Sequence, residues 1–147
     1  MKRALIISII VLSVVALDQA TKYLILTLIP VHDSIEIFPF LRIVHVRNIG
    51  AAFGMFKNLG SAFFVLLSFI AIGFILYLLA KRIYNSFGLS LILGGAIGNL
   101  IDRIAHGMVT DFIDFSVGAF HWPAFNVADS SLTIGIGIIL LTHLLKK

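Results

Sequence analysis

The sequence predicts an all-α membrane protein with a small β element: four transmembrane helices plus a small extracytoplasmic β-sheet. Of the 147 residues, 60% are hydrophobic and only 12% are charged, and the mean hydropathy is +1.10. A water-soluble globule carries about 25% charged residues, so the composition excludes that class. A bilayer-spanning helix needs roughly 20 mostly apolar residues, and the chain has room for four. We therefore expect one integral membrane domain over residues 1–147.

Four apolar stretches are the expected spans. The first follows Met1-Lys2-Arg3 and has the look of a cleaved signal peptide. Its apolar character resumes after Lys22, however, and no small-x-small cleavage site intervenes, so we interpret it as a retained span. The second stretch contains no charged residue and is the clearest span of the chain. The predicted spans cover residues 4–28, 59–80, 86–105 and 123–142.

The segment between the first two spans has a different pattern. Prolines and acids interrupt the helix period there, whereas the short runs at 35–38 and 41–47 are β-branched and aromatic, which favours strands. We expect a β region at about residues 31–57, on the membrane surface. Residues 106–122, rich in phenylalanine, are expected to form a loop.

The basic residues predict the orientation of the chain. Cytoplasmic loops are enriched in Lys and Arg, so both termini should be cytoplasmic and the acids should lie on or near the periplasmic or outer side of a bacterial cytoplasmic membrane. The net charge of +4 needs no nucleic acid to explain it, because the basic residues lie at span ends. With no cysteine in the chain, a thiolate nucleophile is excluded. With four spans, one side carries Lys2, Arg3, Lys81, Arg82, Lys146 and Lys147.

Polar side chains end the third span. A run of uncharged residues from Gly88 to Ile101 leads into Asp102 and Arg103, and Asn99 lies one turn before them. Ionisable groups at membrane depth are costly and usually mark function. Two acids, Asp111 and Asp129, lie beyond them, at the two ends of the connection to the fourth span.

Asp111 and Asp129 are 18 positions apart, with one leaving span three and the other entering span four, so they can meet in space. Two neighbouring carboxylates hold a single proton between them, which supplies both a base to activate water and an acid. Such chemistry needs neither metal nor cofactor. The alternative is that Asp111 is a solvated loop acid and Asp129 an N-cap of span four. Asp114 is assigned to the surface loop because Phe112 and Phe115 flank it.

Three further features have a structural and a functional interpretation. Asp18 and Lys22 lie four apart on one helical face and could be only an ion pair. Asn48 begins a small-residue stretch that could serve only as a turn with close packing. Gly94 and Gly98 have the small-xxx-small spacing that lets helices approach closely.

Three other classes of protein compete with this interpretation. A proton-coupled carrier also places charges within spans but usually shows internal repeats, which this chain lacks. A passive scaffold would tolerate loss of either acid. A metallopeptidase needs clustered ligands such as H-E-x-x-H, and the histidines do not have that spacing. They are scattered singly at positions 32, 45, 106, 121 and 143.

Five blocks of sequence together resemble a known family. In chain order they resemble the signature blocks of bacterial lipoprotein signal peptidase, also called signal peptidase II. The polar positions of each block show no departure from the family pattern. The blocks are D-Q-A-T-K (18–22), N-I-G-A-A-F (48–53), G-G-A-I-G-N-L-I-D-R (94–103), V-T-D-F (109–112) and F-N-V-A-D (125–129).

The resemblance implies an aspartic endopeptidase that removes the signal peptide from diacylglyceryl-modified prolipoproteins, on the amino side of the lipidated cysteine. By motif position, Asp111 and Asp129 would be the catalytic dyad, with no metal and no cofactor. The supporting and substrate-binding residues would be Asp18, Lys22, Asn48, Asn99, Asp102, Arg103 and Asn126.

The resemblance also implies partners. These are lipid-modified prolipoprotein substrates and membrane lipid, with no nucleic acid, and we expect a monomer. The small sheet would cradle substrate, and the loop after Asn48 would help to close over it. Inhibition by the cyclic peptide globomycin is expected by similarity.

Overall fold

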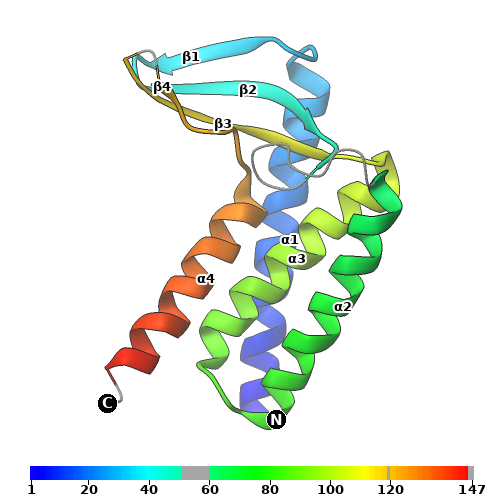
Figure 1. Cartoon of the computed structure of the whole chain (residues 1–147), viewed down its shortest axis with the longest axis vertical. Helices are drawn as coiled ribbons and strands as arrows, with labels where there is room; N and C mark the ends of the chain where they lie inside the picture. The colour runs from blue at the N-terminus through cyan, green and yellow to red at the C-terminus, as the bar shows by residue number, and fades with distance from the viewer. Residues whose placement is uncertain (51–59, 119, 146–147) are drawn as a thin grey trace.

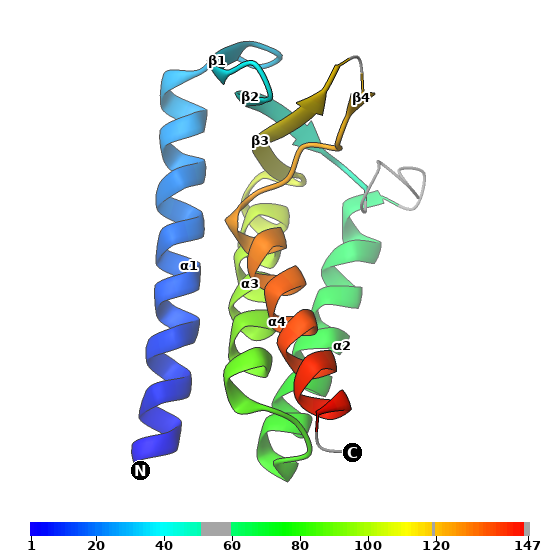
Figure 2. The same ribbon diagram turned by 90° about the vertical axis from the view of Figure 1, so that its left-hand side faces the viewer.

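The computed structural model describes residues 1–50, 60–118 and 120–145, which form four long helices and a four-stranded sheet (Figure 1). All four helices are long and apolar enough to cross a membrane. The sheet lies at one end of the bundle, and the first turn of α1 and the last turn of α4 lie at the other (Figures 1 and 2). The helices are α1 (Lys2–Leu28), α2 (Gly60–Lys81), α3 (Ser86–His106) and α4 (Val127–Leu144).

Helix α3 is the centre of the bundle. In the apolar 18-residue stretch of each helix, 56% of α3 is buried, against 17% for each of the other three helices. Glycines on two sides of α3 permit the close approach of its neighbours. A Cβ added at Gly94 would lie 2.8 Å from the Cβ of Val14 on α1. One added at Gly95 would collide with the carbonyl oxygen of Ala128 on α4. Gly94 and Gly98 therefore serve close helix packing, which brings the polar side chains of three helices together.

The end of the bundle remote from the sheet is fixed by Arg3. Its guanidinium donates hydrogen bonds to the Ser86 hydroxyl at 2.8 and 3.0 Å and to the Leu79 carbonyl oxygen at 3.0 Å. These contacts join the start of α1 to the end of α2 and the start of α3. Just inside them, Ile75 and Leu79 of α2 pack with Leu89 and other apolar residues of α3.

The sheet is antiparallel, with the strands adjacent in chain order. The pairing of β2 with β3 places Val46 opposite Asp111 and Arg42 opposite Asp114, with a register shift between Ile43 and Val46. The strands are β1 (Ser34–Phe38), β2 (Leu41–Asn48), β3 (Val109–Val117) and β4 (Phe120–His121).

Two of these strands correct the sequence-based expectation. Residues 106–122 were expected to form a loop, but they contain β3 and β4. The first residues of β3, Val109 to Phe112, are buried on both faces, so polar and apolar residues do not alternate there as they do in a half-exposed strand. The partner strand β2 lies far away in the sequence, which hides the pairing. Strands β1 and β2 lie within the predicted β region, whereas residues 51–57 of that region are outside the described residues.

The fourth helix begins later than expected. Its predicted start is residue 123, but Phe125 still pairs with Ile113 through backbone hydrogen bonds of 2.8 and 3.1 Å. The chain therefore stays extended up to Asn126. The Asn126 side chain then accepts a hydrogen bond from the Asp129 N–H at 2.9 Å and caps α4. Asn126, rather than Asp129, is the N-cap residue.

Candidate active site

Asp111 is held on β3 by two amide side chains. Its carboxylate accepts hydrogen bonds from Asn126 Nδ2 at 2.7 Å and from Asn48 Nδ2 at 3.0 Å. Only 2% of the residue is exposed. Burial, together with the nearby charge of Asp129, raises the pKa of Asp111 to about 7, although the two amide donors oppose the shift. Asp111 is therefore no solvated loop acid.

Asp129 lies in the first turn of α4. Its Oδ1 accepts a hydrogen bond from Asn99 Nδ2 of α3 at 2.8 Å, and its backbone N–H is bound by Asn126. Negative charge is favoured near a helix N-terminus. The carboxylate is therefore fixed both by its own helix and by the central helix.

Two amides connect the two acids. Asn126 Nδ2 donates to Asp111 and, at 3.3 Å, to Asn99 Oδ1. Asn99 in turn donates to Asp129. The structure thus brings together five residues that sequence reasoning had placed in the site, from β2, β3, α3 and α4: Asn48, Asn99, Asp111, Asn126 and Asp129.

A second, deeper cluster surrounds Lys22 of α1. The ammonium lies 2.8 Å from Asp18 Oδ2 and 3.3 Å from Asp102 Oδ2, and it donates to Asn99 Oδ1 at 3.0 Å. All three charged residues of this cluster are at most 2% exposed. Asp18 and Lys22 are thus more than an isolated pair, because Asp102 and Asn99 of α3 complete the cluster.

Sequence reasoning gave no role in the cluster to Gln19. Its amide donates to Asp18 Oδ2 and Asp102 Oδ1, both at 3.1 Å, and to the Gly98 carbonyl oxygen at 3.2 Å. Gln19 lies inside the D-Q-A-T-K block, and a polar amide one position from a buried acid was the signal that could have identified it.

Arg103 connects the site to α2. Its Nη2 donates to the Gly50 carbonyl oxygen at 3.3 Å, and its guanidinium lies 5.4 Å from the centre of the Phe64 ring. The loop expected to close over substrate follows Asn48, and its residues 51–59 are outside the described residues.

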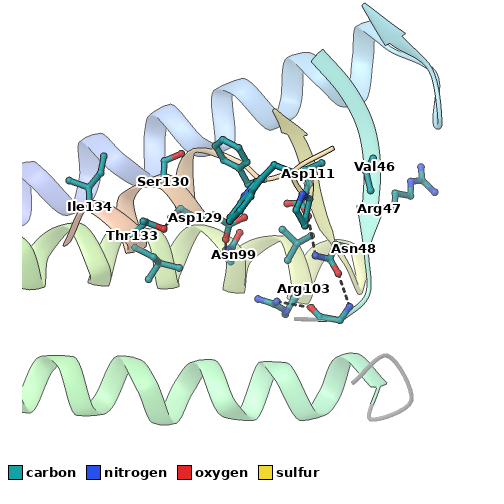
Figure 3. Close-up of a pocket in the computed structure, with 17 residues that line it drawn as sticks. Val46, Arg47, Asn48, Asn99, Arg103, Asp111, Asp129, Ser130, Thr133 and Ile134 are labelled. Atoms are coloured by element: carbon teal, nitrogen blue, oxygen red, sulfur yellow. Dashed lines mark hydrogen bonds between the residues drawn. The ribbon is translucent and has the colours of Figure 1, made fainter. Parts of the chain in front are cut away.

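Both acids line one cavity of about 740 Å³. Figure 3 shows Asp111 from β3 and Asp129 from α4 on its wall, with Asn48, Asn99 and Arg103 around them, and Arg47 directed away. The cavity continues along α4 past Ser130 and Thr133 to Ile134. Its remaining lining residues are Val46, Gly50, Val109, Trp122, Pro123, Ala124, Phe125 and Leu132.

Asp114 is outside this cavity, but it is not the surface-loop acid that was expected. It lies on β3, is 6% exposed and is bound by Arg42 Nη2 and by His121 Nδ1 at 2.6 and 3.1 Å. Burial alone would raise the pKa of Asp114, but the hydrogen bonds from Arg42 and His121 outweigh it and lower that pKa. Sequence reasoning missed this cluster because Arg42 is distant in the chain. His121 is near in the chain, but it reaches Asp114 through the pairing of β3 with β4, which was not predicted.

A buried and a half-buried carboxylate in one cavity, Asp111 and Asp129, can hold one proton between them, so that one acts as a base and the other as an acid. Over the residues that the structure describes, no three His, Cys, Asp or Glu side chains are grouped as a metal site would need. The two carboxylates, held by amide side chains, are arranged so that they could serve as an acid–base pair.

The comparisons with known proteins decide the family. Residues 10–145 match the family model described as signal peptidase (SPase) II. The chain belongs to the signal peptidase II family. Members of this family are aspartic peptidases, so the resemblance found in the sequence is confirmed and so is the predicted enzyme class.

Individual relatives agree with the family match. The lipoprotein signal peptidase of Thermodesulfovibrio yellowstonii is 45% identical over 95% of both chains, and that of Desulforapulum autotrophicum is 44% identical over 90% of this chain and 86% of its own. A solved bacterial membrane enzyme superposes with a TM-score of 0.86 at 39% identity, covering 94% of this chain and 87% of that one. This likeness confirms the predicted fold class of a helical membrane protein with a small sheet.

Proposed function

We propose that the chain is an aspartic endopeptidase that cleaves the signal peptide from diacylglyceryl-modified prolipoproteins, on the amino side of the lipidated cysteine. Cleavage would take place at the outer face of the cytoplasmic membrane. The observation that carries the proposal is the pair Asp111 and Asp129 on the wall of one cavity, joined by Asn126 and Asn99. Membership of the signal peptidase II family supports the same chemistry.

The proposed reaction uses the single proton shared by the dyad. The ionised carboxylate removes a proton from water, and the water oxygen bonds to the carbonyl carbon of the scissile peptide. The protonated carboxyl of the pair then gives its proton to the leaving nitrogen as the carbon–nitrogen bond breaks. Asn48, Asn99 and Asn126 hold the two acids in place, and Arg103 lies beside the cavity where it can bind the substrate backbone.

The extent of the cavity along α4 fits a lipid-anchored substrate. Each buried methylene contributes about 0.8 kcal/mol to anchoring in a bilayer, so a diacylglyceryl cysteine leaves the membrane only at high cost. The cavity continues from the acids along α4 past Leu132 and Ile134. It therefore offers an apolar path from the dyad along a helix that is long and apolar enough to cross a membrane.

The proposed orientation places the sheet outside the cell membrane. Positive residues at the opposite ends of the helices favour the cytoplasmic side for both termini. The sheet itself has two different faces: Arg42, Asp114 and His121 interact on one, while Phe115 and Phe120 are exposed on the other, at 41% and 65%. A sheet with one polar and one apolar face suits the boundary between water and lipid.

We also propose that the chain works as a monomer and that globomycin-type cyclic peptides inhibit it. One chain supplies both acids and all of the lining residues that belong to the described part of the chain, so the proposed site does not depend on a second copy. A cyclic peptide in the cavity would exclude the substrate.

The test is cleavage of a diacylated precursor by the purified chain, with the same precursor lacking the lipid as the matched control. We expect cleavage immediately before the lipidated cysteine, none of the unmodified precursor, and no effect of chelators. Cleavage of both precursors at equal rates would contradict the lipid requirement. No cleavage of either would contradict the proposed activity.

A further inference from the structure

Lys22 has a bonding pattern that a simple ion pair does not need. An ammonium group has three N–H donors, and three oxygens surround this one: Asp18 Oδ2 at 2.8 Å, Asn99 Oδ1 at 3.0 Å and Asp102 Oδ2 at 3.3 Å. The residue is 1% exposed. All donors of Lys22 are therefore used inside the protein, and none is left for substrate.

Each of the two carboxylates bound to Lys22 also holds the backbone next to a dyad acid. Asp102 Oδ2 accepts the N–H of Thr110 at 3.0 Å, directly before Asp111. Asp18 Oδ1 accepts the N–H of Ala128 at 2.9 Å, directly before Asp129. The ammonium of Lys22 thus lies between two clamps, one for each dyad residue.

The third bond of Lys22 fixes an amide. Because Asn99 Oδ1 accepts from Lys22 and from Asn126, the NH₂ group of Asn99 is turned toward Asp129, to which it donates at 2.8 Å. Without the ammonium, the two orientations of the Asn99 amide would differ less in energy, and the donor to Asp129 would be less firmly placed.

We propose that Lys22 is a positioning residue that sets the separation and orientation of Asp111 and Asp129 through Asp102, Asp18 and Asn99. This inference rests on the proposed function, since it assigns a role within the same dyad. Without Lys22, the buried carboxylates of Asp18 and Asp102 would face each other with no ammonium between them. Their repulsion would move the backbone at Thr110 and Ala128 apart, and with it Asp111 and Asp129. This local displacement distinguishes a positioning residue from one that only stabilises the fold.

The test combines kinetics with hydrogen exchange on the full-length chain in lipid nanodiscs. For Lys22→Met we expect kcat on a diacylated precursor to fall about 100-fold while KM changes less than about threefold, as a small displacement of catalytic groups produces. Backbone amide exchange should rise in residues 109–112 and 127–130 and stay unchanged in α2. The matched control is Lys2→Met, the same change on the exposed start of α1, which should behave as wild type.

Several results would overturn the proposal. Wild-type kcat in Lys22→Met would remove its role, and a raised KM with unchanged kcat would make Lys22 a substrate-binding residue. Faster exchange throughout all four helices would reduce it to a stabilising residue. Failure of the wild type to cleave would overturn the proposed function instead, while the exchange comparison would still test the clamp.

If Lys22→Met fails to accumulate in the membrane, two milder variants replace it. Asp102→Asn should raise exchange only around Thr110, and Asp18→Asn only around Ala128, because each carboxylate holds one backbone N–H. Both should lower kcat without raising KM. Exchange that rises on both sides in either variant, or on neither, would contradict two separate clamps joined by Lys22.

Discussion

Asp111 is the residue whose protonation should limit activity. Its pKa is raised to about 7 by burial and by the charge of Asp129. The proposed dyad would need one proton, so that proton should be lost, and kcat/KM should fall, as the pH rises through about 7. Measuring kcat/KM for a diacylated precursor across the pH range checks this. Constant activity up to about pH 9 would show that no such proton is required.

Asp114 provides a contrasting case on the same strand. Because its folded-state pKa is lowered, the stability it contributes is present at neutral pH and is lost as the pH falls through that lowered pKa. We expect Asp114→Asn to keep full kcat and to lower the free energy of unfolding at neutral pH by about 1 kcal/mol, since Arg42 and His121 are partly exposed and solvent screens them. Thermal unfolding at pH 7 and pH 3 measures the loss, which should shrink at the lower pH. An inactive but folded variant would mean that Asp114 belongs to the catalytic machinery.

The polar residues of the site could be predicted from their place in the sequence, but their partners could not. Asn99 and Asp102 are conspicuous because they follow an apolar span. That Asp102 accepts the N–H of Thr110, or that Gln19 bridges Asp18 and Asp102, depends on how α1, α3 and β3 meet. Side-chain types and spacing do not contain that information.

At the scale of elements, the contact between α3 and α4 should control the position of Asp129 in the proposed dyad. A Cβ at Gly95 would collide with the Ala128 carbonyl oxygen and come within 2.9 Å of Leu132 Cγ, whereas one at Gly137 would meet nothing within 4 Å. We expect Gly95→Ala to push the helices apart and to reduce kcat about 100-fold, because Asn99 lies one turn further along α3 and holds Asp129.

The control for this prediction is Gly137→Ala, the same change on α4 facing open space. It should leave kcat unchanged and the free energy of unfolding within about 0.5 kcal/mol of the wild-type value. Equal kcat in the two variants would show that the dyad tolerates movement of α4, and the contact between α3 and α4 would then have no control over catalysis.

The helices and strands differed in how well the sequence predicted them. Helices α1 and α2 were predictable because long, mostly apolar runs have few alternatives to a membrane span. Strand β3 was not, because its polar residues Thr110, Asp111 and Asp114 are buried rather than exposed to water. The start of α4 was misplaced because the pairing of Phe125 with Ile113 keeps the chain extended beyond Pro123.

At the scale of the whole molecule, the orientation in the membrane can be tested because the chain has no cysteine. A single cysteine can therefore be labelled without background. We expect Asp33→Cys, next to the sheet, to react with a membrane-impermeant maleimide in intact cells once the outer membrane, where present, is made permeable. Tyr84→Cys, between α2 and α3, should react only after the inner membrane is disrupted. The reverse pattern would contradict an extracytoplasmic sheet.

The fold class follows from composition because only helices and closed barrels satisfy their backbone within lipid. The arrangement of the helices does not follow in the same way. The central place of α3 is set by glycines that fit against Val14 and Ala128, and a small-residue spacing predicts close packing without naming the partner helix.

The most direct test of the aspartic dyad is cleavage of a diacylated precursor by Asp111→Asn and Asp129→Asn, each isosteric with the acid it replaces. Both variants should insert in the membrane and unfold near the wild-type temperature, yet each should lose at least about 1,000-fold in kcat, because neither can share a proton with the remaining acid. Turnover at the wild-type rate in either folded variant would remove that residue from the dyad and contradict the central claim.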